Sequence, residues 1–200
     1  MTSKRSVLVF AGSTRADSLN RKLAAVAASL AREQGASVTH IELKNYPLPI
    51  YEGDYEASHG VPPSAGELRG LLKRHDVWLI ASPDYNSSIA PILKNVIDWV
   101  SRPVDGEDYV ACFKQRTVGI MASSPGSSGG ARGLPHLRHV LQHLGANVLG
   151  EQFTLPRGAS AFTQTGSLAD PARLQQLHEF VRKAIESAEA AVPLERTHAA

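Results

Sequence analysis

The sequence has almost no cysteine, no marked excess of one charge and no long hydrophobic run. Cys112 is its single cysteine, which excludes an internal disulfide and a multi-cysteine metal site and points to a reducing compartment such as the cytoplasm. The 21 basic and 19 acidic residues nearly balance, which excludes a nucleic-acid-coating protein and a disordered polyelectrolyte. No stretch approaches the roughly 18 apolar residues of a membrane-spanning helix, and the run after residue 5 is too short for a secretory signal. We expect a soluble, cytoplasmic protein that binds neither nucleic acid nor membranes.

Three unbroken hydrophobic runs, at residues 7–10, 77–81 and 118–122, predict buried strands. Continuous hydrophobicity is typical of parallel strands that helices cover on both faces. Two further segments, 38–43 and 147–153, alternate apolar and polar residues. They predict strands at the edges of the sheet, where one face is wetter.

Segments with amphipathic helical spacing follow each predicted strand. They cover residues 20–34, 64–75, 89–101, 134–144 and 171–188. This fivefold alternation predicts a single α/β domain over residues 1–200, a three-layer sandwich with a parallel sheet. Five strands, each followed by a helix, favour the flavodoxin-like order 2-1-3-4-5 over the six-stranded dinucleotide-binding fold.

Two features fall outside this pattern. Residues 45–63 contain four prolines and three tyrosines and predict a long loop, either a functional lid or contact or a mobile surface excursion. Trp99 lies off the apolar stripe of its helix, which predicts a second buried face of the kind a subunit contact requires.

The loop after the first strand has the composition of a phosphate site. Ligands of an open parallel sheet bind beyond the carboxyl ends of the strands, near the reversal of strand order, and here the loops after the first, third and fourth strands meet that condition. The first loop offers polar donors and one cation directly before a helix: Ser13, Thr14, Ser18, Asn20 and Arg15. It lacks the P-loop and GxGxxG patterns. The alternative is a hydroxyl-rich turn in which Ser18 or Asn20 caps the helix.

The second loop is suited to a flat ring, and the third to backbone contacts with a ligand. Residues 82–88 combine a fixed turn, an aromatic face and an amide, although turn chemistry alone also selects Pro, Asp, Asn and Ser. Residues 123–130 are small and flexible enough to bring backbone amides close to a ligand edge, or else form a surface linker.

The loop sequences resemble the NADPH-dependent FMN reductase family, which has the flavodoxin-like fold and includes quinone, azo-dye and chromate reductases. The resemblance rests on GSTRxxSLNRKL at 12–23, PDYNSSIxxxLKNxIDW at 83–99 and SSPGxxGGAR at 123–132. These blocks occur in the family's order and spacing and together span most of residues 6–145.

The resemblance implies FMN as the cofactor and assigns its contacts. The expected phosphate contacts are Ser13, Arg15, Ser18, Leu19 and Asn20. The expected ring contacts are Pro83, Asp84, Tyr85, Asn86 and, from the third loop, Ser124. It also implies a homodimer or homotetramer with residues 94–99 at a subunit contact.

The family resemblance also implies the chemistry. NADPH, or NADH in its place, passes a hydride to the flavin, and a quinone or similar small oxidant then takes its place, which predicts ping-pong kinetics. The flavin carries this chemistry, so no catalytic acid or base is assigned, and a backbone N–H near Asn86 is suited to the N5/O4 edge of the ring. The alternative is a flavodoxin-type electron carrier, but such carriers are strongly acidic and this chain is near neutral.

Two residues depart from the family pattern. Asp84 stands where the family usually has glutamate, so any contact of that carboxylate is open. Asp17 places an acid in the phosphate loop, and we expect it to point outward.

The histidines of the fourth predicted helix and the single cysteine do not indicate a reactive centre. His136, His139 and His143 recur at helical spacing, but without an acidic neighbour a solvated or interface face is favoured over a metal site. Cys112 has no activating partner in the sequence, so we expect a buried, unreactive thiol.

Overall fold

A parallel sheet forms the centre of the computed structural model, which describes residues 4–104 and 106–190. Its strands lie in the order β2 (Ser37–Ile41), β1 (Ser6–Ala11), β3 (Val77–Ala81), β6 (Thr117–Ser123) and β7 (Asn147–Val148). A further strand, β8 (Phe153–Leu155), pairs in parallel with the carboxyl half of β6. The predicted order 2-1-3-4-5 is confirmed, with β6 in the fourth place and β7 and β8 sharing the fifth.

The prediction of one continuous fifth strand over residues 147–153 is wrong. The chain leaves the sheet after β7 and returns as β8, so the two short strands pair with different halves of β6. The Arg138 guanidinium, on the neighbouring helix, donates to the carbonyls of residues 148–151. These carbonyls are therefore satisfied by a side chain and not by a strand ladder, which explains the interruption.

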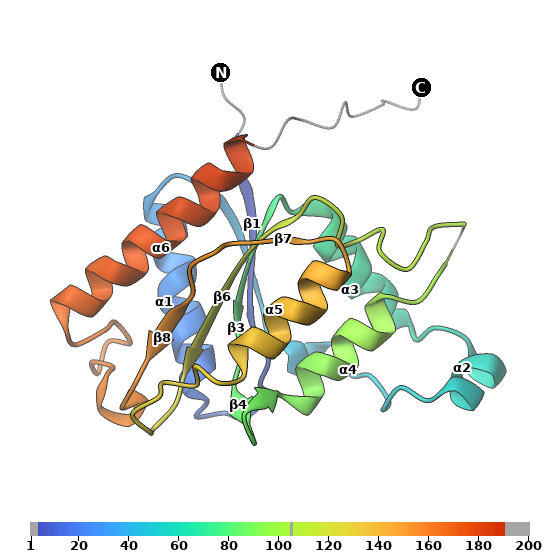
Figure 1. The fold of residues 1–200 in the computed structure, drawn as a ribbon, viewed down its shortest axis with the longest axis horizontal. Helices are drawn as coiled ribbons and strands as arrows, with labels where there is room; N and C mark the ends of the chain where they lie inside the picture. Colours follow the sequence, from blue (N-terminus) through green and yellow to red (C-terminus); the bar gives the residue numbers. More distant parts are fainter. Residues whose placement is uncertain (1–3, 105, 191–200) are drawn as a thin grey trace.

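Helices cover both faces of the sheet, as predicted (Figure 1). On one face lie α1 (Leu19–Glu33) and α6 (Pro171–Ala190). On the other lie α3 (Pro63–Arg74), α4 (Pro91–Val100) and α5 (Leu134–His143). None of the described helices has the length and hydrophobicity that crossing a membrane requires.

The unbroken hydrophobic runs are explained by two separate cores. Val7 and Val9 of β1 pack with α1 and α6, whereas Leu8 and Phe10 pack on the opposite face. Successive side chains of a strand point to opposite faces, so a strand between two helical layers is apolar at every position. All four of these side chains are buried.

Residues 45–63 are more ordered than the predicted loop. They contain α2 (Gly53–His59), whose first N–H groups are capped by the Glu52 carboxylate through Asp54 and Tyr55. The preceding residues run against α4, where the Pro49 carbonyl accepts hydrogen bonds from Asn95 Nδ2 at 2.9 Å and Trp99 Nε1 at 2.8 Å.

This contact accounts for the second face of α4. The Trp99 ring is fully buried, with the Tyr51 and Tyr55 rings edge-on to it at centroid distances of 5.1 and 6.1 Å. The prediction that α4 buries a second face at Trp99 is confirmed, and residues 49–55 of the same chain cover it. The predicted subunit contact at residues 94–99 stays a prediction.

Candidate functional site at the carboxyl edge of the sheet

The loops after β1 and β3 lie against each other at the carboxyl edge of the sheet. The Gly12 N–H donates to the Ala81 carbonyl at 2.9 Å. A Cβ at Gly12 would lie 2.9 Å from Leu93 Cβ and 3.3 Å from Pro83 Cδ. Only glycine therefore allows the first loop to lie this close to the second loop and to α4.

The first loop presents donors around the start of α1. Ser18 is the N-cap of that helix and its Oγ accepts the Arg21 N–H at 3.4 Å, so the predicted cap is confirmed. Leu19 and Asn20 follow as the first helical residues, whose N–H groups have no partner within a helix. Ser13 is buried, and its Oγ accepts the Arg15 N–H at 3.4 Å.

The charged side chains of this loop separate into two roles. Arg15 and Asp17 are exposed, which confirms the outward position expected for the acid. Arg21 instead holds the loop from behind, because its side chain donates to the carbonyls of Arg15 and Ala16 at 2.9 and 3.0 Å and pairs with Glu42. The exposed Arg15 side chain is therefore available to bind an anionic ligand. Its cation and the free N–H groups of the helix start fit a phosphate dianion.

Asn20 joins the first loop to the end of β6. Its Nδ2 donates to the Ser123 carbonyl and its Oδ1 accepts the Ser123 N–H, both at 2.9 Å, in a buried position. The side chain thus bridges two of the three loops. Its direct contact with a phosphate stays a prediction.

The third loop rests on a segment that the sequence analysis did not identify. The Ser124 carbonyl accepts the Gly158 N–H at 2.9 Å, and the Gly126 carbonyl accepts the Arg157 N–H at 3.1 Å. A Cβ at Gly158 would overlap Ser123 Oγ and lie 2.8 Å from Leu19 Cδ1. Residues 155–158 are therefore part of the site, and the Pro-Arg-Gly turn after β8 was the signal available in the sequence.

The second loop is a hairpin and not an irregular loop. Strands β4 (Asp84–Tyr85) and β5 (Ser88–Ile89) pair antiparallel across a two-residue turn. Both turn residues, Asn86 (φ 53°) and Ser87 (φ 62°), are left-handed, as a type I′ turn requires. Pro83 is buried beneath the hairpin, whereas Tyr85 is 46% exposed and the Asn86 N–H is bonded to none of the described residues.

Asp84 holds the hairpin in place despite its short side chain. Its Oδ1 accepts the Ser87 N–H at 2.9 Å, and its Oδ2 accepts the Gly133 N–H at 3.2 Å, at the start of α5. A second link joins Ser88 Oγ and His136 Nδ1 at 3.1 Å. Asp84 stands where the family usually has glutamate, and its carboxylate contacts backbone N–H groups of this chain.

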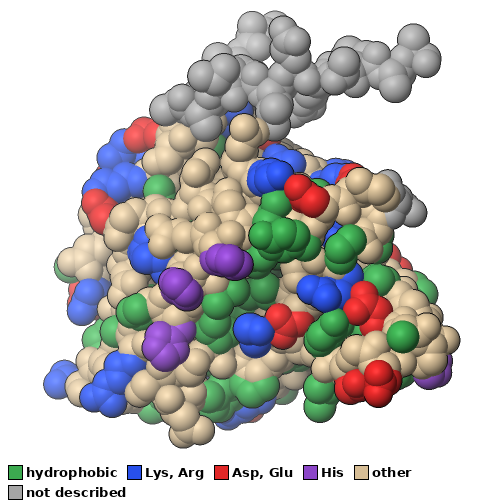
Figure 2. Space-filling view, turned by 45° about the vertical axis from the view of Figure 1, so that its right-hand side comes forward, with side chains coloured by type: hydrophobic (Ala, Val, Ile, Leu, Met, Phe, Trp, Pro, Cys, Tyr) green, Lys and Arg blue, Asp and Glu red, His purple; other side chains and the backbone are tan. Residues whose placement is uncertain are grey.

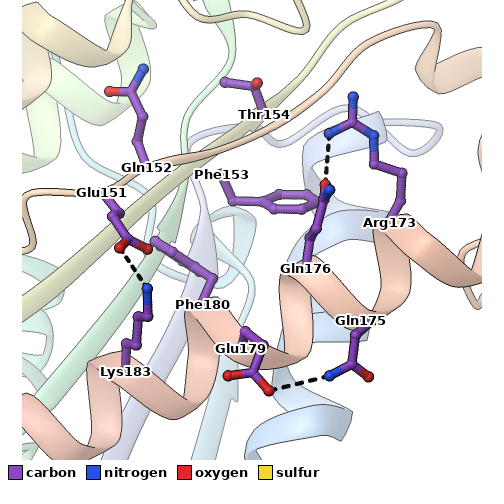
Figure 3. A pocket seen from close by; sticks show the side chains of 10 residues that line it. All are labelled: Glu151, Gln152, Phe153, Thr154, Arg173, Gln175, Gln176, Glu179, Phe180 and Lys183. Atoms are coloured by element: carbon purple, nitrogen blue, oxygen red, sulfur yellow. Dashed lines mark hydrogen bonds and ion pairs between the residues drawn. The ribbon is translucent and has the colours of Figure 1, made fainter.

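Two hollows lie outside the three loops. One, of about 390 Å³, opens between β8 and α6 (Figure 3). Its polar side chains pair with one another, through Glu151–Lys183 at 2.5 Å and Arg173–Gln176 at 2.8 Å. The other, of about 350 Å³, lies between α4 and α5. Neither contains a residue of the predicted site.

The described residues hold no thiol or metal centre at these loops. His136, His139 and His143 are exposed on α5, and no three His, Cys, Asp or Glu side chains within 4–104 and 106–190 gather as metal ligands. Cys112 is fully buried and its Sγ donates to the Val100 carbonyl at 3.3 Å. Burial raises the pKa of its thiol to about 11.

Comparison with known proteins identifies the family of this chain. The model of the family described as NADPH-dependent FMN reductase matches residues 5–160. The NAD(P)H-dependent FMN reductase of Pseudomonas aeruginosa is 31% identical over 191 residues, covering 92% of this chain and 98% of that protein. The quinone reductase of Escherichia coli (strain K12) is 34% identical over 150 residues, covering 74% of this chain and 76% of that protein.

Solved structures give the same fold. The flavoenzyme NAD(P)H:(acceptor) oxidoreductase FerB of Paracoccus denitrificans has a TM-score of 0.79 at 29% identity, covering 94% of this chain and 98% of that chain. A flavodoxin from the domain Archaea, 11% identical, has a TM-score of 0.60 over 92% of this chain and 99% of that one, which shows the fold alone.

The strand order and the solved structures define a flavodoxin-like fold, and the family match defines an oxidoreductase that uses FMN. The chain belongs to the NADPH-dependent FMN reductase family. Membership confirms the predicted resemblance, the enzyme class, FMN as cofactor and NAD(P)H as reductant.

The raised pKa of Cys112 predicts an inert thiol. At pH 8 only about one thiol in a thousand is ionised when the pKa is about 11, whereas a thiol of ordinary pKa near 8.5 is about one quarter ionised. We expect a disulfide reagent to modify native Cys112 more than 100-fold more slowly than the unfolded chain, as followed by absorbance. The native rate should rise with pH up to about 11. Equal rates in native and denatured protein would contradict this burial.

Proposed function

We propose that this enzyme transfers electrons from NADPH, or from NADH in its place, through FMN to a quinone or similar small oxidant by a ping-pong cycle. The observation that carries the proposal is the junction of the three loops: Gly12 packs against Pro83 of the hairpin loop, and Asn20 bonds to Ser123 at the start of the third loop. A relative named as a quinone reductase supports the choice of acceptor.

The phosphate end of FMN is assigned to the first loop. Arg15 supplies the cation, and the N–H groups of Leu19 and Asn20 point out of the start of α1. Ser13 and Ser18 complete the donor set, although Ser18 Oγ already accepts one backbone N–H as the helix cap. In this proposal the positive end of the helix and the exposed Arg15 cation bind the same ligand group.

The ring end is assigned to the hairpin and the third loop. Pro83 gives a rigid base, Tyr85 presents an exposed aromatic face, and the unpaired Asn86 N–H is a donor for the polar edge of the ring. Asp84 shapes the hairpin through its two backbone bonds. Ser124 directly follows Ser123, the residue that Asn20 joins to the first loop.

FMN, when bound, supplies the hydride acceptor and donor, so the chain's residues need only bind, orient and tune it. No histidine, carboxylate or thiol among these contacts is required to move a proton, and we assign no catalytic acid or base. Reductant and oxidant would bind in turn at the one site beside Tyr85 and Asn86, and this shared site predicts ping-pong kinetics. The formal net charge of +2 does not favour an electron carrier that docks through an acidic surface.

We also propose a homodimer or homotetramer in the cytoplasm. The hollow between α4 and α5 supports the assembly, because Ile97, Val140 and Leu144 line it beside the exposed His139 and a polar rim. Figure 2 shows histidines next to hydrophobic side chains on this side of the molecule. Ile97 and Leu144 are already buried within the chain, so a second copy would cover chiefly the partly exposed Val140 and the exposed histidines beside it.

The reaction is tested by spectroscopy and kinetics on the purified protein with FMN. We expect a flavin absorbance band that NADPH bleaches and a quinone restores without any partner protein. Initial rates at several quinone concentrations should give parallel double-reciprocal lines. Protein that fails to take up FMN would overturn the function, whereas intersecting lines would overturn only the ping-pong cycle. A requirement for a partner protein would favour the electron carrier.

The phosphate site is tested by Arg15→Ala. Loss of a charge-assisted contact should weaken FMN binding about tenfold, as measured by quenching of flavin fluorescence. Riboflavin, which lacks the phosphate, should bind the variant and the wild type equally. Arg32→Ala is the matched control, because it removes an exposed arginine at the far end of the same helix. Unchanged FMN affinity in Arg15→Ala would contradict the assignment.

The assembly is tested by light scattering. We expect the mass of two or four chains, and Val140→Lys should lower it because the change puts a charge into the hollow between α4 and α5. Gln175→Lys, an exposed change on α6 on the opposite side of the sheet, should leave the mass unchanged. A monomeric wild type would contradict the proposal.

A further inference from the structure

The hairpin turn of the second loop has an unfavourable backbone conformation that needs support. Asn86 and Ser87 both have positive φ. Glycine and asparagine tolerate this conformation, but serine carries a Cβ and lacks the amide that helps asparagine adopt it. The Ser87 N–H is bonded by Asp84 Oδ1 at 2.9 Å, which closes the turn from within. The carboxylate thus holds the residue that is least suited to the turn.

The second oxygen of the same carboxylate ties the turn to a helix. The N-cap residue of α5 is Gly133, which has no side chain to cap the helix, and the first turn of α5 contains no acidic residue. Asp84 Oδ2 accepts the Gly133 N–H at 3.2 Å and so places a negative charge at the positive end of that helix. A Cβ at Gly133 would lie 2.8 Å from the Ser88 carbonyl oxygen, so the helix start and hairpin are in direct contact.

We propose that Asp84 is a positioning residue for the flavin ring. Its two acceptor oxygens fix the turn, and with it the Asn86 N–H, in the conformation in which the hairpin meets the ring, and Asp84 makes no direct flavin contact. The inference rests on the proposed function. It depends on a carboxylate, because an amide at this position accepts through one oxygen only and turns an NH₂ donor toward the other N–H.

The variants separate these hydrogen bonds from charge. Asp84→Asn keeps the shape of the side chain and loses one acceptor, and Asp84→Ala removes both acceptors without adding a donor. Asp17→Asn is the matched control, since it removes an exposed negative charge from the adjacent loop. Loss of charge alone would leave FMN binding equal or tighter in all three proteins, because the phosphate is an anion.

The first measurement is amide hydrogen exchange in protein without FMN. We expect the Ser87 and Gly133 amides to exchange about tenfold faster in Asp84→Asn and Asp84→Ala, with no change in Asp17→Asn. Amides of β3 should keep their wild-type protection in every variant, which shows that the fold is retained. Wild-type exchange at Ser87 and Gly133 in both Asp84 variants would overturn the proposal.

The second measurement is flavin binding. Both Asp84 variants should bind FMN and riboflavin about tenfold more weakly, by the same factor for each, because the ring and not the phosphate is affected. At saturating FMN their visible spectra should shift toward that of free FMN, whereas Asp17→Asn should retain the wild-type spectrum. If the wild type binds FMN and the Asp84 variants match it in affinity and spectrum, the role of Asp84 is overturned alone. A wild type that binds no FMN overturns the proposed function instead.

Discussion

The candidate site depends on the pair of hydrogen bonds between the Asn20 amide and the Ser123 backbone. Both bonds are buried, and breaking either would leave a polar group without a partner, at a cost of about 1–3 kcal/mol. They fix the start of α1, where we propose the phosphate binds, to the end of β6, which leads into the loop proposed to contact the ring. One side chain thereby joins the first and third loops of the candidate site, and Gly158 packs against Ser123 and Leu19 at this junction.

Much of the fold was predictable because both faces of the sheet are covered. Buried strands such as β1 form unbroken hydrophobic runs that are easily found in the sequence. The helices between them are found from hydrophobic residues that recur every three to four positions. The interruption of the fifth strand was not predictable, because it depends on Arg138 reaching carbonyls across space. The covering of Trp99 by residues 49–55 was hidden for the same reason: it joins residues some 50 positions apart.

The candidate site was predictable in its position and less so in its shape. Topology alone brought the three loops together, and their residue types indicated a phosphate at one end and a flat ring at the other. The left-handed pair that makes the second loop a hairpin was not evident, because Ser87 is unusual there. The bridging role of Asn20 and the support from Gly158 were also hidden, since both act between distant segments.

The backbone carbonyl of Pro49 anchors residues 49–55 to α4 without using a side chain of that segment. The group that accepts both the Asn95 and the Trp99 hydrogen bonds is a backbone carbonyl, which any residue at that position would supply. Ile50, directly after it, is 85% exposed and contributes nothing to this anchor. The tip of the segment can therefore change its side chain freely between homologues while the helix beneath keeps its cover.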